Sequence, residues 1–172
     1  MKKPVEVFFD NCIFSHSVTD VKSLTPERDR WLIDQIPAIE ELHDLYLGDE
    51  IKIEYDLNIF IELWMCNSII KQLIEEKWGE IKPGPTWVGF RGTMVNCIVK
   101  AGWEKRLLKL KEIFKDDSLD VTHLANAELY NVEYFVTTDH KLINKANNEG
   151  KGRLRIKVVS PREFLEIYHA EN

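Results

Sequence analysis

Short apolar runs rich in β-branched and aromatic residues alternate along the chain with segments in which apolar residues recur at helical spacing. The runs predict four strands, at residues 5–10, 51–55, 133–137 and 155–159. Strands that alternate with helices are typical of a parallel sheet with right-handed crossover connections. We therefore predict an α/β fold with the strands at 5–10 and 133–137 adjacent at its middle. The strand at 51–55 should flank the first of these, and 155–159 should flank the second.

Capping residues predict where the helices begin and end. Thr25 precedes a helix that Gly48 ends, and Pro37 should kink or split this helix. Asp56 should cap a helix that extends as far as Trp78. Periodicity and capping signals predict further helices near 103–114, 118–130 and 139–147, and from residue 160 onward.

Residues 79–102 interrupt this alternation of strands and helices. The segment contains several glycines and prolines but also apolar residues such as Val95 and Ile98, so we expect a structured excursion and not a flexible linker. A chain of 172 residues is most simply one domain. We therefore predict a single domain over residues 1–172 with this excursion inside it.

The composition is that of an ordinary globular protein, with 44% hydrophobic and 30% charged residues. The net charge of -6 argues against non-specific binding of polyanions over the whole surface, but it allows a local basic groove. Three scattered cysteines without a CxxC motif fit reduced thiols in the cytoplasm. We expect no signal peptide and no membrane-spanning segment, because no apolar run is long enough for either.

Two of the β-rich runs close in aspartate: residues 5–10 at Asp10, and residues 134–139 at Asp139, just after the strand predicted at 133–137. The carboxyl ends of parallel strands form the edge of a sheet at which ligands bind. Glu62 and Asp120 lie on predicted helices and complete a set of four acids that the fold would bring together. Because isolated buried carboxylates are costly, several in one place indicate a bound cation or shared protons. Hard cations such as Mg²⁺ and Mn²⁺ select carboxylate oxygens, and they promote phosphodiester hydrolysis by neutralising the phosphate and activating water.

The segments around these acids resemble the motifs of the PIN-domain nuclease family. That family has an apolar strand ending in Asp, a capped helix with Glu six positions after the cap, an Asp that opens an alanine-rich helix, and a strand ending in Thr-x-Asp. The matching segments of this chain are Val5–Asn11, Asp56–Leu63, Ser118–Ala127 and Glu133–Asp139, followed by a strand and helix at Ile156–Leu165. Together they span nearly the whole chain in the order that the family shows.

The resemblance implies a three-layer α/β/α sandwich with a central, mostly parallel sheet, and metal-dependent cleavage of RNA. It also implies that four acids are catalytic and hold Mg²⁺ or Mn²⁺: Asp10, Glu62, Asp120 and Asp139. Many such domains are toxins of type II toxin–antitoxin pairs, so an antitoxin protein and a second copy of the chain are candidate partners beside RNA. Two departures from the pattern matter. Lys141 stands where some members carry a further acid, and the excursion at 79–102 is longer than in compact toxins.

Each acid also has a purely structural interpretation. Asp10 and Asp139 could simply cap the helices that follow them, and Asp120 could be an ordinary acid in the first turn of a helix. For Glu62, neighbouring acids on the same segment are alternatives. We predict metal binding at all four positions, because two of the acids end buried strands and the other two match the family's spacing.

Other residues are expected beside the acids without binding the metal. Thr137 should orient a site carboxylate or satisfy a backbone group, and Asn11 should position metal-bound water or satisfy the turn after the strand. His123 shares a helix face with Asp120 and could tune a ligand, although a packing role in the core is the more common one for such a histidine. Cys12 should fill a small space in the core.

Basic residues that could bind the RNA phosphates lie in three places. Lys141 is two residues from Asp139, and Arg91 lies in the excursion close to Trp87, which could stack on bases. A predicted helix carries a basic face with Lys105, Arg106, Lys109 and Lys111. The alternatives are a solvated helix face and, within the excursion, a small local core.

Two rival functions remain open. A non-catalytic PIN-like module would bind RNA or a protein partner and use the acids for structure. A metal-dependent phosphatase would act on small phosphate esters. Acids at all four positions favour catalysis, and the basic residues beside them favour RNA as the substrate.

Overall fold

The computed structural model describes residues 3–79, 102–115 and 118–171, so most of the predicted excursion lies outside the described residues. Within them, four strands form one parallel sheet in the order β2-β1-β3-β4. The strands are β1 (Val5–Phe9), β2 (Ile51–Glu54), β3 (Tyr134–Val136) and β4 (Lys157–Val159). The predicted α/β fold and strand order are confirmed, with β1 and β3 adjacent at the middle and β2 and β4 at the edges.

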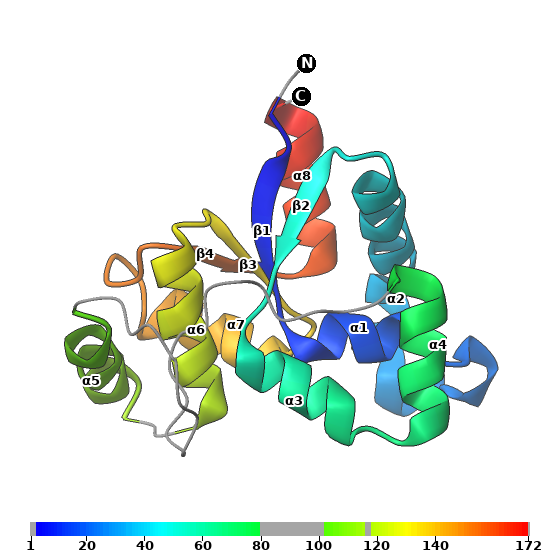
Figure 1. Cartoon of the computed structure of the whole chain (residues 1–172), viewed down its shortest axis with the longest axis horizontal. Helices are drawn as coiled ribbons and strands as arrows, with labels where there is room; N and C mark the ends of the chain where they lie inside the picture. Colours follow the sequence, from blue (N-terminus) through cyan, green and yellow to red (C-terminus); the bar gives the residue numbers. More distant parts are fainter. Residues whose placement is uncertain (1–2, 80–101, 116–117, 172) are drawn as a thin grey trace.

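Helices connect the strands and surround the sheet (Figure 1). They are α1 (Asn11–Ser17), α2 (Pro26–Leu47), α3 (Leu57–Met65), α4 (Ser68–Trp78), α5 (Trp103–Phe114), α6 (Leu119–Tyr130), α7 (His140–Asn148) and α8 (Pro161–Glu171), with a short 3-10 helix at Val21–Ser23. Helix α8 packs against α2, α5 packs against α6, and α1 contacts both α2 and α3. Over the part of the chain that is described, no helix combines the length and the apolar character needed to cross a membrane.

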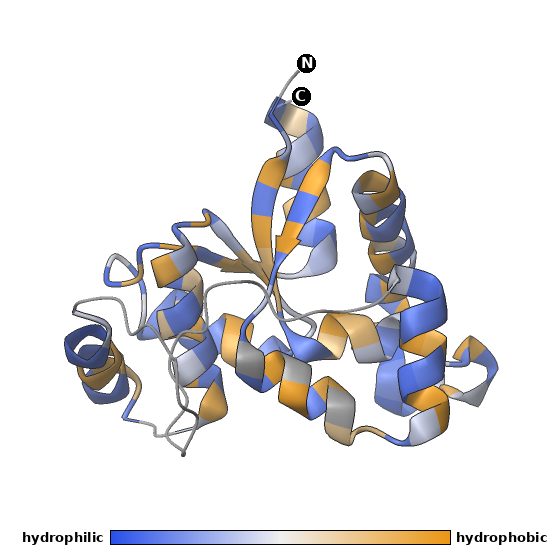
Figure 2. Cartoon of the chain, in the orientation of Figure 1, coloured by the Kyte–Doolittle hydropathy of each residue, from blue (hydrophilic) through white to orange (hydrophobic). Residues whose placement is uncertain are grey.

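A buried core fixes the ends of the two central strands. The last residues of β1, from Val7 to Phe9, are fully buried, as are Phe135 and Val136 of β3. The rings of Phe8 and Phe135 stack with their centroids 5.5 Å apart. Figure 2 shows that polar and apolar residues alternate along β2 and at the start of β1, whereas the buried end of β1 is apolar. The continuous apolar run expected of a strand that helices enclose is thus confined to the middle of the sheet.

The register of the sheet brings the carboxyl ends of β1 and β3 to the same level. Phe9 pairs with Val136, and the backbone N–H of Asp10 donates to the carbonyl of Val136 at 3.1 Å. The next residues after the two strands are therefore neighbours in space. In Figure 1 this edge lies where β1 runs directly into α1.

Two of the predicted helix boundaries are wrong. Pro37 does not split α2, which continues through it as one helix. Buried apolar residues that follow Pro37, among them Ala38, Ile39 and Leu42, anchor the helix in the core despite one missing hydrogen bond. The single helix expected from Asp56 to Trp78 is two helices, α3 and α4. At the break Cys66 has an extended backbone, and the side chain of Asn67 caps α4 with a 2.9 Å hydrogen bond to its first turn.

The predicted capping box at the start of α8 is confirmed. The backbone N–H of Ser160 donates to the carboxylate of Glu163 at 2.8 Å, and the N–H of Glu163 donates to the hydroxyl of Ser160 at 3.2 Å. This reciprocal pair fixes the direction in which the chain leaves β4.

Candidate active site at the carboxyl edge of the sheet

Asp10 follows β1 directly and is fixed by hydrogen bonds on both carboxylate oxygens. Oδ1 accepts from the backbone N–H of Asn11 at 2.7 Å, so Asp10 is the N-cap of α1. Oδ2 accepts from the hydroxyl of Thr137 at 2.7 Å and from the thiol of Cys12 at 3.1 Å. The residue is only partly buried. Its carboxylate is therefore oriented from the protein side and still reachable from outside, so a capping role and a metal-binding role are compatible.

Thr137 joins Asp10 to Asp139. Its side chain is fully buried, and its hydroxyl donates to Asp10 at 2.7 Å while accepting from the backbone N–H of Asp139 at 3.0 Å. The single hydroxyl thus orients one predicted acid and satisfies the backbone of another. The structure brings Asp10 and Asp139 together in this way.

Cys12 takes part in the hydrogen bonds of the site, a role beyond the predicted filling of space in the core. Its sulfur donates to Asp10, lies 3.1 Å from the hydroxyl of Thr137 and accepts from the backbone N–H of Thr138 at 3.2 Å. Burial, and then the nearby charge of Asp10, raises the pKa of the Cys12 thiol well above its ordinary value. The thiol therefore stays protonated at neutral pH and remains a hydrogen-bond donor to the carboxylate.

Asn11 is the first residue of α1. Its backbone N–H donates to Asp10, and its side-chain oxygen accepts from the hydroxyl of Ser15 at 3.4 Å. The residue thus satisfies the turn after the strand, while the part of its predicted role that involves water depends on a bound metal.

Asp139 caps α7 at the end of the segment that follows β3. Its Oδ1 accepts from the backbone N–H groups of Lys141 at 2.8 Å and Leu142 at 3.0 Å. The carboxylate is partly buried, and the side chain of Lys141 is exposed to solvent beside it. As with Asp10, the capping hydrogen bonds orient the acid without enclosing it.

Glu62 is connected to a buried acid–histidine pair. His123 of α6 is 2% exposed, its Nδ1 lies 2.9 Å from Asp56 Oδ2, and its Nε2 lies 3.4 Å from Glu62 Oε1. Asp56 is 1% exposed and also accepts from the backbone N–H of Ile59 at 2.9 Å and from the amide of Asn126 at 2.5 Å. His123 therefore bridges the buried carboxylate of Asp56 and the more exposed carboxylate of Glu62.

The charges of this group follow from its hydrogen bonds. Burial opposes protonation of the imidazole, but hydrogen bonds to Asp56 and Glu62, and the charges of Asp56 and Asp10, outweigh it and raise the pKa of His123 to about 10. Burial also acts to raise the pKa of Asp56, but the bonds from His123, Asn126 and Ile59 outweigh it and lower that pKa. At neutral pH the buried, charged imidazolium of His123 thus orients the carboxylate of Glu62 by a hydrogen bond.

Asp120 is exposed in the first turn of α6, one turn before His123. Within the described ranges, no three or more His, Cys, Asp and Glu side chains gather closely enough to hold a metal ion. The predicted convergence of all four acids around one cation-sized space is therefore not seen among these residues. The hydrogen bonds instead place Asp10 beside Asp139, and Glu62 against α6. The donors themselves, carboxylate oxygens that are partly or fully exposed, are of the kind that Mg²⁺ and Mn²⁺ select.

Arg106 has a structural role in place of the predicted contact with substrate. Its side chain is 11% exposed and forms a bidentate ion pair with Glu128, whose side chain is 1% exposed. It also donates to the backbone carbonyl of Arg153 at 2.7 Å. The expectation that Arg106 faces outward on a basic surface is wrong, because the buried carboxylate of Glu128 requires a cation beside it.

Most of the remaining predicted basic residues are exposed, and one lies outside the described residues. The side chains of Lys105, Lys109 and Lys141 are exposed, and that of Lys111 is partly buried. Arg91 and Trp87 lie outside the described residues. Of the exposed lysines, Lys141 follows a predicted acid most directly, whereas Lys105 and Lys109 lie on α5, which packs on α6.

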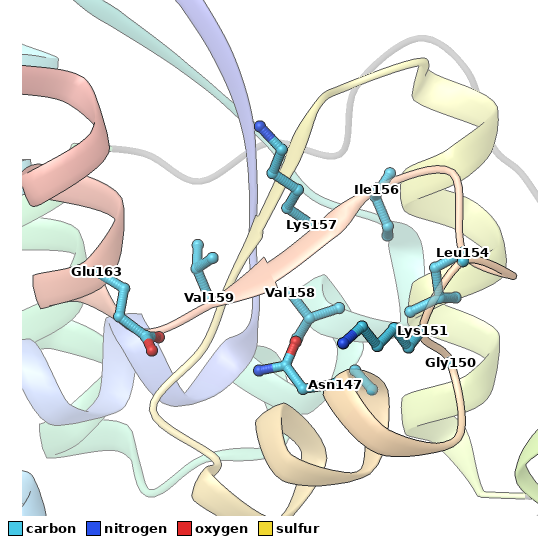
Figure 3. A pocket seen from close by; sticks show the side chains of 11 residues that line it. Asn147, Gly150, Lys151, Leu154, Ile156, Lys157, Val158, Val159 and Glu163 are labelled. Atoms are coloured by element: carbon cyan, nitrogen blue, oxygen red, sulfur yellow. The ribbon is translucent and has the colours of Figure 1, made fainter. Parts of the chain in front are cut away.

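A cavity of about 480 Å³ lies apart from these acids, beside β4 and the loop after α7 (Figure 3). Its lining includes Asn147, Lys151, Val158 and Glu163, and none of the four predicted acids is among the lining residues. The carboxylate of Glu163 is already engaged in the capping box of α8. The chemistry-bearing residues therefore lie at the open carboxyl edge and not in this cavity.

No family model, curated protein or solved structure matches the chain. The function is therefore inferred from the residues of the site and from their motifs.

Proposed function

We propose that the protein is a divalent-metal-dependent ribonuclease of the PIN type, built as a three-layer α/β/α sandwich. The observation that carries the proposal is the hydrogen-bonded group at the carboxyl edge of β1 and β3, where the hydroxyl of Thr137 joins Asp10 to Asp139. This edge is the usual ligand site of parallel α/β sheets. Two carboxylates that are held in place there and remain accessible suit a site where a cation and a phosphodiester meet.

The residues of the site have distinct roles under this proposal. Asp10 and Asp139, which Thr137 joins, would hold Mg²⁺ or Mn²⁺. Glu62 and Asp120, which lie at α6, would complete the ligands of the ion as it binds. The ion would neutralise the phosphate and lower the pKa of the attacking water. Thr137 and Cys12 keep the carboxylate of Asp10 oriented, and the charged His123 keeps Glu62 oriented. Such supporting residues commonly change metal affinity or activity by about 10- to 100-fold when they are removed.

RNA cleavage is tested directly by incubating the purified protein with single-stranded RNA and, separately, with a small phosphate ester such as p-nitrophenyl phosphate. We expect cleavage of the RNA with Mn²⁺ or Mg²⁺, none with excess chelator, and no hydrolysis of the ester. Binding of RNA without cleavage under any divalent metal would assign the protein to the class of non-catalytic modules. Hydrolysis of the ester alone would make it a phosphatase.

Metal binding should also stabilise the fold. A ligand that binds only the folded state adds about 2.7 kcal/mol to the free energy of unfolding at one hundred times its dissociation constant. We expect Mn²⁺ to raise the melting temperature of the wild type, and Asp10→Asn to remove most of that rise. Asp44→Asn, a change at an exposed position of α2, is the matched control and should respond like the wild type. An unchanged metal response in Asp10→Asn would show that Asp10 is not a ligand.

Lys141 is exposed two residues after Asp139 and should contact an RNA phosphate. Lys141→Ala should weaken RNA binding and lower the slope of log affinity against log salt by roughly 0.7, the value for one phosphate contact on a single strand. Metal affinity should stay nearly unchanged. Lys151→Ala, at an exposed lysine that follows the far end of α7 and lines the cavity beside β4, is the control. A salt slope that is the same in Lys141→Ala and the wild type would exclude this contact.

A further inference from the structure

Trp31 stands apart from the other tryptophans whose side chains the structure describes. It is 36% exposed, whereas Trp78 is 5% and Trp103 is 8% exposed. Tryptophan is favoured at contact surfaces because it offers a large, rigid aromatic face. Trp31 is therefore a candidate contact residue for a ligand.

The surroundings of Trp31 place it beside the proposed site. Its indole N–H donates to the backbone carbonyl of Thr138 at 2.8 Å, so the ring is fixed to the residue that precedes Asp139. Its ring also lies against the imidazole of His140, with the centroids 4.7 Å apart and the planes tilted by 43°. His140 is exposed and directly follows Asp139. Two aromatic rings that contact each other thus lie beside the segment that carries this acid.

Thr138, to which the indole of Trp31 is hydrogen-bonded, is also held by a second helix. Nδ1 of His16, in α1, lies 2.7 Å from the hydroxyl of Thr138, and Thr138 itself is 5% exposed. Helices α1 and α2 therefore both hold Thr138, and the position of Trp31 relative to Asp139 is fixed by hydrogen bonds and not by packing alone.

We propose that Trp31 and His140 form a stacking platform for an unpaired nucleobase of RNA, next to the phosphate that would lie at Asp139. This inference rests on the proposed ribonuclease function. Aromatic side chains stack on the faces of all four bases, so such a platform holds single-stranded RNA without reading its sequence. The exposed Lys141, one residue further along, supplies a positive charge for the adjoining phosphate. Trp31 and His140 would then contact a base, while Lys141 and Asp139, which adjoin His140 in the chain, would lie at the neighbouring phosphate.

The test compares binding of two fluorescein-labelled oligomers in excess chelator, so that no cleavage occurs. One is a short single-stranded RNA, and the other has the same ribose-phosphate backbone with the bases removed. We expect Trp31→Leu and His140→Ala to weaken binding of the RNA roughly ten-fold, within the range measured for the loss of one stacked base. Neither variant should alter binding of the abasic oligomer. Trp31→Phe keeps an aromatic face without the N–H donor and should retain most of the affinity for RNA.

Leu47→Ala is the matched control, since Leu47 is a 65% exposed apolar residue on the same helix. It should bind both oligomers like the wild type. The platform is wrong if Trp31→Leu and His140→Ala bind RNA as the wild type does. It is also wrong if their affinity for the abasic oligomer falls by the same factor as their affinity for RNA. Either result would overturn the platform even when cleavage with Mn²⁺ persists. If the wild type neither binds nor cleaves RNA, the proposed function fails, and the platform fails with it.

Discussion

Asp10→Asn and Asp139→Asn should each reduce metal-dependent cleavage of RNA by roughly 100-fold or more, the loss that corresponds to about 2.7 kcal/mol of transition-state stabilisation. Asparagine has the shape of aspartate and retains one oxygen that can accept the capping hydrogen bonds to α1 and α7. It lacks the negative charge that a divalent cation requires of its ligands. Activity should therefore fall far more than stability does.

The measurement is kcat/KM for a fluorogenic single-stranded RNA at saturating Mn²⁺, with the free energy of urea unfolding as the check on folding. Asp44→Asn should cleave like the wild type, because this exposed acid of α2 lies outside the site. Comparable cleavage by Asp10→Asn, Asp139→Asn and the wild type would remove both acids from the catalytic mechanism. Cleavage that persists in excess chelator would remove the metal as well.

The order of the strands could be predicted because local and long-range signals agree. Each strand is a short apolar run followed by a helix, and the rule that crossovers are right-handed leaves few arrangements of four parallel strands. The apolar runs also end in polar residues, which marks the carboxyl edge of the sheet. The contact between Asp10 and Thr137 follows from the register in which Phe9 pairs with Val136.

The break between α3 and α4 was missed because apolar residues continue across it at helical spacing. The signal was present in Asn67, which caps α4, but an asparagine within an amphipathic pattern does not by itself end a helix. At Pro37 the sequence predicts an interruption, but α2 continues through this residue as one helix. The effect of Pro37 on α2 depends on how much of the surrounding helix is buried, and this is a property of the tertiary structure.

The bridge from Asp56 through His123 to Glu62 could not be predicted, because it joins residues far apart in sequence. A partial signal exists in α6, where His123 and Asn126 are polar residues three positions apart on a buried helix face. Buried polar residues at this spacing require partners, and the capping residue of another helix supplies one. Arg106 carried no such signal, since the need of Glu128 for a cation is visible only in the folded chain.

The largest effect on stability should come from Asp56→Ala. Its side chain accepts from the imidazolium of His123, the amide of Asn126 and the first turn of α3. Truncation would leave a buried charge and further donors without an acceptor. Removing one partner of a buried ion pair typically costs about 3–5 kcal/mol, and loss of a helix cap typically costs about 1 kcal/mol. We expect a decrease of roughly 3–5 kcal/mol in the free energy of unfolding, because part of the two costs overlaps and His123 can lose its proton.

Asp20→Ala provides the matched control for the cap alone. Asp20 also caps a helix through its side chain, with a 3.0 Å hydrogen bond to the N–H of Lys22. Unlike Asp56 it is exposed, and among the described residues it forms no ion pair with a buried side chain. Its loss should cost no more than about 1 kcal/mol. Urea unfolding of both variants at neutral pH separates the two contributions. Equal destabilisation in Asp56→Ala and Asp20→Ala would mean that the buried pair with His123 adds little, and that His123 does not hold Glu62 as a charged group.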